Sequence, residues 1–385
     1  MRDSARSDPR RLQLASFICV FDRFAMPPML VAIARDLGVP LSQIVAAAGA
    51  YFLTYGLMQP VWGMLSTRIG LAATMRWCIL IGGLATLTTA FAPGVATLTV
   101  GRAVAGGLFA AGFPAALIYV GTTAPLDRRQ REVTNLMTGA ALGTALATVV
   151  AGGLTYLVGW RSVFVLSGVL GIGSSLYLWR LVELPRMPWR APLLAPLRRV
   201  LTRPSVLMLL VLAALDGAAI LGALTFLPTA VQSTGRNAAT AAGITALYGV
   251  AVLIAAQIVG RLSARVGRGQ FILAGAAAGA VGCGLLAYSV GLVVAGIGCL
   301  LLGVAWASMH SALQTWATEI MPAERGLTVS FFAGSLFAGS AVAAAVGGPF
   351  AEARDFMPLF SAAAVVLLVV GTSGYVARAR WEHRQ

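Results

Sequence analysis

The sequence predicts an all-α membrane protein with twelve transmembrane helices, arranged as two pseudo-symmetric halves of six helices each. Three observations lead to this fold class: a very apolar composition, apolar blocks as long as a membrane span, and a repeat that relates the two halves. Of the 385 residues, 58% are hydrophobic and 11% are charged, whereas soluble domains carry about 25% charged residues. This composition excludes a soluble enzyme, a secreted disulfide-rich module and a disordered chain.

The apolar blocks run for about 20 residues, which is the length that a helix needs to cross a bilayer. They lack the alternation, in blocks of about ten residues, that marks the strands of an outer-membrane barrel. We therefore assign one helix to each block. The predicted spans are residues 12–34, 43–66, 73–92, 95–120, 134–157, 161–181, 205–229, 240–262, 270–289, 292–315, 326–348 and 356–377.

One long hydrophilic gap, residues 182–204, separates six predicted spans from six. Its prolines and arginines indicate a cytoplasmic linker between an N-terminal half, residues 1–181, and a C-terminal half, residues 205–385. The helical spacing of its leucines, such as Leu194 and Leu197, leaves a second interpretation open. In that interpretation, part of the linker is an amphipathic helix on the membrane surface.

The basic residues predict the orientation of the chain. All 28 are arginines; with the N-terminus in the cytoplasm, 22 fall on cytoplasmic segments or span ends and four on the other side. This split follows the positive-inside rule, and twelve spans return the C-terminus to the cytoplasm. Because the arginines lie in the gaps between spans, the net charge of +15 indicates loop topology and no nucleic-acid partner. Arginine, alanine and glycine without lysine indicate a GC-rich bacterial gene, and hence the bacterial inner (plasma) membrane.

A repeat relates the two halves. Residues 60–70 read PVWGMLSTRIG and residues 257–267 read QIVGRLSARVG. The shared positions lie at an offset of 197 residues and include the pairs Gly63/Gly260, Arg68/Arg265 and Gly70/Gly267. Two six-span repeats are typical of secondary transporters, in which the binding site lies between the repeats.

Four segments carry a resemblance to a known family. GMLSTRIG, residues 63–70, is similar to the Gly-x-Leu-x-Asp-Arg-x-Gly motif of the major facilitator superfamily. LTVGRAVAGG places Arg102 at the intramembrane arginine of that family, and GWRSVF and MPAERG are similar to two further family segments. The chain resembles this superfamily along nearly its whole length, and it most resembles the drug and metabolite efflux branch.

The resemblance implies the major facilitator fold and a gate on the cytoplasmic side. The gate residues that it implies are Gly63, Arg68 and Gly70 in the first copy of the motif and Gly260, Arg265 and Gly267 in the second. The chain also departs from the family pattern. Thr67 stands in place of the motif aspartate, and Thr148-Val149 stand in place of the Gly-Pro of the antiporter branch.

Ionisable residues inside the predicted spans are candidates for function, because charges are costly within a bilayer. Asp22 and Asp216 each lie about ten residues into equivalent spans, the first and the seventh, and hence near the bilayer midplane. A carboxylate at that depth can bind and release a proton as water access changes, which is what proton coupling requires. The alternative is a carboxylate that an arginine holds permanently to fix helix packing.

Two arginines accompany these carboxylates. Arg102 cannot lose its proton and needs an anion. Because the resemblance implies that the first and fourth spans are neighbours, Asp22 is its expected partner. This pair is then either a switch in coupled transport or a static staple between two helices. Arg23 follows Asp22 but projects about 100° away from it around the helix, so these two residues need not pair.

Further candidates lie around the expected cavity. Pro27 and Pro28 are expected to break the first helix just beyond Asp22. His310 is a candidate proton relay, although a lone histidine is more often a hydrogen-bonded structural residue. Aromatic residues that are candidates for the cavity lining, or alternatively for the helical core, are Tyr51, Tyr55, Phe113, Tyr248 and Trp306.

The sequence predicts a proton-coupled secondary transporter that exports a drug or metabolite by alternating access. The alternative function is uptake of a small organic solute, such as an anion attracted by Arg23 and Arg102. No nucleotide-binding GxxxxGK[ST] loop occurs in the sequence, so an ion gradient is the expected energy source. The four cysteines lie apart inside apolar blocks, so we expect no disulfide or metal site. No nucleophile, metal cluster or catalytic His/Asp set is visible in the sequence, so we expect no enzyme activity and no cofactor. The expected partners are the solute, protons and membrane lipid, with the chain as a monomer.

Overall fold

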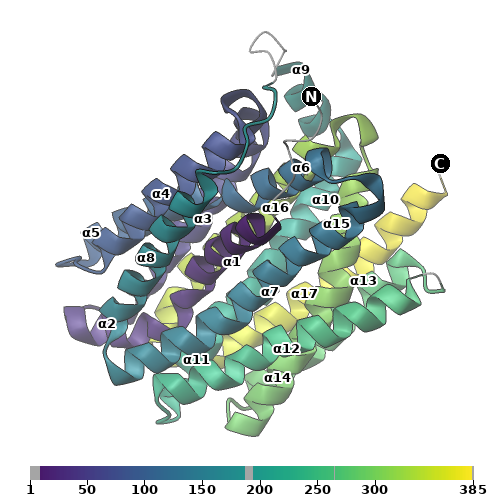
Figure 1. The fold of residues 1–385 in the computed structure, drawn as a ribbon. Helices are drawn as coiled ribbons and strands as arrows, with labels where there is room; N and C mark the ends of the chain where they lie inside the picture. Colours follow the sequence, from purple (N-terminus) through teal and green to yellow (C-terminus); the bar gives the residue numbers. More distant parts are fainter. Residues whose placement is uncertain (1–8, 187–193, 264, 384–385) are drawn as a thin grey trace.

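The computed structural model describes residues 9–186, 194–263 and 265–383, and these form a bundle of long helices (Figure 1). Twelve helical segments in this part of the chain are long and apolar enough to cross a membrane, from Pro9–Leu37 to Met357–Glu382. The predicted fold class is confirmed. Span ends differ from the prediction where polar residues continue a helix beyond its apolar part, as in Leu292–Glu319. The predicted halves and linker include residues outside this description: 1–8, 187–193, 264 and 384–385.

The helices follow one another along the chain as expected for two sets of six spans. Before the linker lie α1 (Pro9–Ala25), the 3₁₀ turn η1 (Pro27–Met29), α2 (Leu30–Leu37), α3 (Leu41–Ile69), α4 (Leu71–Thr89), α5 (Val95–Phe109), α6 (Gly112–Thr123), α7 (Leu126–Leu157) and α8 (Trp160–Leu178). The linker contains α9 (Leu194–Leu201). After it lie α10 (Pro204–Asp216), the π turn η2 (Gly217–Leu221), α11 (Gly222–Ser233), α12 (Ala238–Leu262), α13 (Arg268–Tyr288), α14 (Leu292–Ala305), the π turn η3 (Trp306–His310), α15 (Ser311–Glu319), the 3₁₀ turn η4 (Pro322–Glu324), α16 (Arg325–Glu352) and α17 (Met357–Glu382).

The first span is interrupted where the sequence predicts it. α1 ends at Ala25, and the chain continues as η1, Pro27–Met29, before α2 begins. Proline lacks the backbone N–H that an α-helix needs, so two prolines in succession interrupt the hydrogen-bond ladder. The break is buried, and the carbonyl oxygen of Pro28 accepts a hydrogen bond at 3.3 Å from the side chain of Gln232 in α11. The Pro28 carbonyl group, which the break leaves without a partner in the helix, is therefore hydrogen-bonded within the protein, as it must be at membrane depth.

Two pairs of helices join the halves: α3 packs along α16, and α7 packs along α12. Both contacts depend on small residues that let two backbones approach each other. A Cβ atom on Gly56 of α3 would lie 2.7 Å from the carbonyl oxygen of Gly334 in α16. A Cβ atom on Gly152 of α7 would lie 2.2 Å from the Cβ atom of Ala242 in α12. The halves therefore meet almost backbone to backbone.

The bundle has two ends, which differ in how the halves are joined. The linker end holds α9, the start of α1 and the end of α17 (Figure 1); we call the opposite end the far end. At the far end, the Ser42 backbone N–H donates a hydrogen bond to Glu352 Oε2 at 2.9 Å, across the two halves. The Gln232–Pro28 hydrogen bond also crosses the halves toward this end. In this structure the halves are thus bonded together at the far end.

Part of the linker is helical, as one of the two interpretations predicts. α9 spans Leu194–Leu201, and its Val200 is buried while Arg198 and Arg199 are exposed. Arg199 forms an ion pair with Glu324 of η4, and this contact attaches α9 to the C-terminal half. An apolar side toward the protein and a basic side toward solvent are typical of a helix that lies on a surface.

Within the C-terminal half, α16 also crosses α10 closely. A Cβ atom on Gly339 would lie 1.8 Å from the carbonyl oxygen of Ala214. Gly339→Ala should therefore force these helices apart and destabilise the protein by about 1–3 kcal/mol, as overpacking does. The measurement is the melting temperature of the purified protein. Gly284→Ala is the matched control, because a Cβ atom there has no neighbour within 4 Å; equal melting temperatures for the two variants would contradict the packing described here.

Candidate functional site

In the N-terminal half, α1 and α5 bring Asp22 and Arg102 together inside the bundle. Arg102 Nη2 lies 3.0 Å from Asp22 Oδ2, and Arg102 Nη1 donates to Asp22 Oδ1 at 3.2 Å. The Asp22 side chain is 0% exposed and the Arg102 side chain is 1% exposed. This contact is the one that the sequence predicts for the intramembrane arginine. Its two parallel hydrogen bonds have the geometry of a bidentate pair, which fixes orientation as well as charge.

Asp22 has further partners that sequence reasoning missed. Thr86 of α4 donates its hydroxyl to Asp22 Oδ1 at 3.0 Å, and Ser167 of α8 donates to the same oxygen at 2.8 Å. The Arg102 guanidinium in turn lies 4.3 Å from the ring centroid of Tyr51. The charged form of Asp22 is thus held by four hydrogen bonds from three helices. Short hydroxyl side chains on apolar helices are the signal that could have revealed these partners.

In the C-terminal half, a second carboxylate pairs with a histidine. Asp216 Oδ2 lies 2.7 Å from His310 Nδ1, and the two side chains are 0% and 6% exposed. The other carboxylate oxygen, Oδ1, is buried and has no hydrogen-bond partner among the described residues. The His310 ring stacks on Trp306, with centroids 3.7 Å apart. Asp216 and His310, which the sequence treats as separate candidates, therefore form one buried, hydrogen-bonded pair.

Both members of this pair lie beside a π turn. Asp216 ends α10 and directly precedes η2, and His310 is the last residue of η3. Each π turn widens one turn of the helix, and such turns occur frequently at functional sites. In the part of the chain that the structure describes, both π turns lie at this pair. The helix geometry thus departs from the regular α-helix at the Asp216–His310 contact.

Arg23 is directed away from Asp22, toward the other half. Its Nη1 donates to the hydroxyl oxygen of Tyr55 in α3 at 3.4 Å, and its Nε is buried without a hydrogen-bond partner among the described residues. Its guanidinium carbon lies 5.0 Å from the ring centroid of Phe337, which belongs to α16 of the C-terminal half. Arg23 therefore lies at the contact between the two halves.

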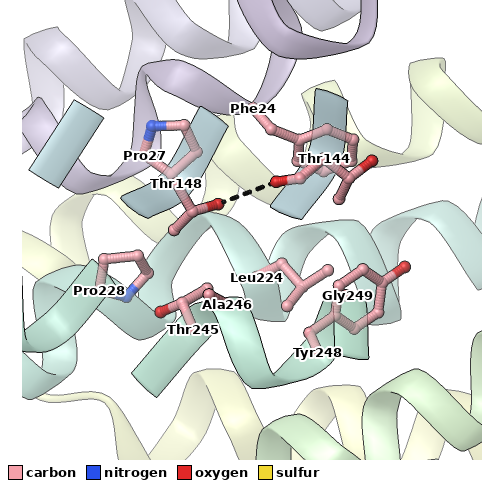
Figure 2. A pocket seen from close by; sticks show the side chains of 10 residues that line it. All are labelled: Phe24, Pro27, Thr144, Thr148, Leu224, Pro228, Thr245, Ala246, Tyr248 and Gly249. Carbon is pink, nitrogen blue, oxygen red and sulfur yellow. Dashed lines mark hydrogen bonds between the residues drawn. The ribbon is translucent and has the colours of Figure 1, made fainter. Parts of the chain in front are cut away.

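A small pocket lies between the halves, and one of its lining residues, Phe24, contacts Arg23. Its volume is about 20 Å³, which is room for about one water molecule. Figure 2 shows Pro27 and Thr148 on one side of it, facing Pro228 and Thr245 on the other. The full lining is Phe24, Pro27, Thr144, Thr148, Leu224, Pro228, Thr245, Ala246, Tyr248 and Gly249.

Of the aromatic cavity candidates, Tyr248 lines this pocket and the others take different positions. Tyr51 packs on Arg102, and Tyr55 contacts Arg23. Trp306 stacks on His310, and Phe113 is a partly buried residue packed against the core. Asp22 and Asp216 are fully buried and do not line the pocket as it stands here.

The first copy of the repeated motif packs against the opposite half. A Cβ atom on Gly63 would lie 2.4 Å from Ser330 Oγ of α16, and Arg68 is buried. Gly70 has a φ of 116°, which favours glycine, and turns the chain between α3 and α4. In this copy the small residues therefore allow a close contact between α3 and α16 at the linker end.

The second copy of the motif has a more open environment. A Cβ atom on Gly260 would have no neighbour within 4 Å, and Arg265 is exposed. Gly267 precedes α13, and its N–H donates to the Gln270 side chain at 3.1 Å. The two copies, alike in sequence, thus differ in packing at the linker end.

Glu183 is a further residue that sequence reasoning missed. Its carboxylate accepts hydrogen bonds from the backbone N–H groups of Ala72 at 3.1 Å and Ala73 at 2.8 Å. It therefore caps the N-terminus of α4, where a negative charge is favoured by the helix dipole. The signal was present, because Glu183 is the single acidic residue between 182 and 204.

Comparisons with known proteins agree with this architecture. A family model described as the Major Facilitator Superfamily matches residues 12–344 and 232–384. The crystal structure of a mutant of the nucleoside transporter NupG superposes with a TM-score of 0.80 at 14% sequence identity, over 96% of this chain and 99% of that chain. At such low identity the likeness concerns the fold.

Curated relatives match parts of the chain. The uncharacterized transporter YgaY of Escherichia coli O157:H7 is 32% identical over 179 residues, or 46% of this chain and 44% of that protein. The multi-drug resistance efflux pump PmrA of Streptococcus pneumoniae is 28% identical over 160 residues, or 39% of this chain and 37% of that protein. The chain thus spans less than half the length of these relatives.

The buried Asp22–Arg102 pair generates a stability prediction. Asp22→Asn leaves Arg102 buried without its counter-charge and should destabilise the protein by about 3–5 kcal/mol. The double variant Asp22→Asn/Arg102→Gln removes both charges and should recover much of the lost melting temperature. The matched control is Asp36→Asn, because the Asp36–Arg161 pair is 46% and 45% exposed and such surface pairs contribute about 0–1 kcal/mol. If the double variant were no more stable than Asp22→Asn, the Asp22–Arg102 pair would not be a static contact that holds α1 and α5 together.

Proposed function

This chain belongs to the Major Facilitator Superfamily, and on that premise we propose that it is a proton-coupled secondary transporter of a small organic molecule. It works by alternating access, in which the two halves rock about the central site and open it to one side of the membrane at a time. The close contacts of α3 with α16 and of α7 with α12 are the surfaces about which the halves move. The hydrogen bonds between the halves at the far end support closure of that end in this state.

The observation that carries proton coupling is the Asp216–His310 pair. When the imidazole gains a proton, the net charge of the pair changes from −1 to zero. A net charge in the membrane interior is costly, so the proton stabilises states in which the pair is sealed from water. Release of the proton then requires opening to water on one side. This linkage between charge and access couples a proton gradient to movement of the halves.

The Asp216–His310 pair, rather than Asp22, is the proposed site of proton exchange. Asp22 is bound by an arginine, which cannot give up its proton, and by two hydroxyl groups. Asp216 is bound by a histidine, which can give up and take up a proton, and its second oxygen has no partner among the described residues. We therefore propose that the Asp22–Arg102 pair fixes the geometry of the N-terminal half while the C-terminal half exchanges protons.

The proposed direction of transport is export of a drug or metabolite. The name of one relative, the multi-drug resistance efflux pump PmrA, supports this direction. A second candidate is uptake of a small organic solute together with protons. The position of Arg23, a cation at the contact between the halves, favours this candidate because it would attract an anion. Both candidates use the same central site.

We place the chain as a monomer in a bacterial inner membrane, with both termini and the linker in the cytoplasm. The arginine distribution supports this orientation. In the structure the start of α1, the end of α17 and α9 lie at one end of the bundle (Figure 1). The linker end is then the cytoplasmic end, and the far end faces the periplasm.

Proton coupling is tested once a transported compound is in hand, and thermal-shift screening of the purified protein against drug and metabolite sets supplies it. Asp216→Asn keeps the size of the side chain but removes the carboxylate that shares a proton with His310. In proteoliposomes, the variant should lose accumulation driven by an imposed pH gradient, by about tenfold or more, as removal of a general acid–base group does. It should retain exchange of labelled for unlabelled compound, because exchange needs no net proton movement.

The matched control for this experiment is Asp355→Asn, because Asp355 is an exposed aspartate near the far end. It should accumulate the compound as the wild type does. Equal accumulation by Asp216→Asn and wild type at the same protein level would exclude Asp216 as the coupling residue.

A further inference from the structure

Arg23 has no counter-ion in the part of the chain that the structure describes. Its one side-chain hydrogen bond is to the Tyr55 hydroxyl at 3.4 Å, and its Nε is buried without a partner. A guanidinium cannot shed its charge by losing a proton. A cation inside a membrane protein is costly unless an anion balances it. Arg23 is therefore a cation without a directly paired anion in the described structure.

The nearby carboxylates of the chain are already engaged. Asp22, the neighbour of Arg23 in sequence, accepts hydrogen bonds from Arg102, Thr86 and Ser167. Asp216 is bound to His310. In the N-terminal half, the charges of Asp22 and Arg102 cancel and leave the positive charge of Arg23. An anion that pairs directly with Arg23 must therefore come from outside the chain.

Aromatic rings surround the Arg23 guanidinium and leave it no acidic partner. Its central carbon lies 4.9 Å from the ring centroid of Phe24, 5.3 Å from that of Tyr55 and 5.0 Å from that of Phe337. Cation–π contacts of this kind hold a charge with about 0.5–2 kcal/mol each, which is weaker than a buried ion pair. The rings can therefore stabilise the cation while no anion is bound, and an anion that pairs with Arg23 can replace these weaker contacts.

Arg23 also adjoins the pocket between the halves. Phe24, which contacts the guanidinium, lines this pocket, and so does Tyr248 of α12 (Figure 2). The ring centroid of Tyr248 lies 6.4 Å from that of Trp306, which stacks on His310. Aromatic residues of one pocket thus connect to Arg23 on one side and to the Asp216–His310 pair on the other.

We propose that Arg23 is the anchor for the substrate, and that the substrate is a small organic acid with a single carboxylate or sulfonate group. Arginine binds such groups through two parallel hydrogen bonds. One arginine without a counter-ion matches one negative charge, and the rings of Phe24, Tyr55 and Phe337 suit an apolar or aromatic body. This inference rests on the proposed transport function, to which it adds the class of substrate.

The charges of anion and proton balance each other at this site. Binding of the organic acid adds one negative charge beside Arg23, and protonation of the Asp216–His310 pair adds one positive charge. The charges of Asp22, Arg102, Arg23 and the unprotonated pair sum to zero, and the sum is again zero when the acid and one proton are both bound. Either one alone leaves a net charge, which is costly in a low-dielectric site, so the acid and the proton favour each other's binding, as uptake of the acid together with protons requires.

The test is binding by the purified full-length protein, measured as thermal shift and by titration calorimetry. The probes are three organic acids, each with a neutral analogue of similar shape: benzoate with benzamide, benzenesulfonate with benzenesulfonamide, and gluconate with glucose. At least one acid should stabilise the wild type while its neutral analogue does not. Arg23→Gln should weaken that binding by about 10- to 100-fold, as loss of a charge-assisted bidentate contact does.

Two further variants separate this role from a structural one. Arg35→Gln removes an exposed arginine near the far end and should leave binding unchanged. Arg23→Gln should lower the melting temperature of the empty protein less than Asp22→Asn does, because it removes cation–π contacts but breaks no buried ion pair. Arg23→Lys keeps the charge without the planar fork and should bind the acid with intermediate affinity.

Three results would overturn the proposal: no acid stabilises the wild type, the neutral analogue binds as well as its acid, or Arg23→Gln keeps full affinity. The proposed function fails separately. If an acid binds through Arg23 but is not accumulated under a pH gradient, the anion site is supported and proton coupling is rejected. If a neutral compound is accumulated by a mechanism that needs Asp216 but not Arg23, proton coupling is supported and the anion site is rejected.

Discussion

A charge in the middle of a membrane protein needs a partner, and this constraint organises the centre of the structure. Asp22 meets it through Arg102 and two hydroxyl groups, in a contact that leaves nothing of either charge exposed. Asp216 meets it through His310. Arg23 meets it only partly, through aromatic rings. The partners of these three charges therefore differ in kind: an arginine cannot give up its proton, a histidine can, and aromatic rings bring no opposite charge.

The two halves each hold a buried carboxylate and differ in its partner. In each half, the carboxylate of the first span contacts the fourth span, Asp22 with Arg102 and Asp216 with His310. The arginine of the N-terminal pair cannot give up its proton, and we propose that this pair fixes the geometry of its half. The C-terminal pair contains a histidine instead, the proposed site of proton exchange, and it lies beside two π turns. The copies of the repeated motif also differ: at the linker end, Gly63 packs against α16, whereas Gly260 has no neighbour there.

The fold could be predicted from the sequence because bilayer thickness sets the length of every span, so that block length and composition suffice. The Asp22–Arg102 contact could be predicted because the family resemblance makes the two spans neighbours. The Asp216–His310 contact was not predicted, because no family motif marks His310 as a partner, and the π turns at which both residues lie leave no signal in hydropathy. The capping by Glu183 depends on the path of a linker, which hydropathy does not reveal.

The central claim is that the imidazole of His310 exchanges the coupled proton, and nuclear magnetic resonance of histidine tests it most directly. The chain has two histidines, so His383→Gln leaves His310 as the single imidazole. In nitrogen-15-labelled protein in lipid bilayers, its signals should change from the neutral to the charged form when the pH of the sample is lowered. Asp216→Asn, which removes the partner of the imidazole, should alter that change. An imidazole that stays in one form at every pH at which the protein is folded, with the same spectrum in Asp216→Asn, would contradict the account.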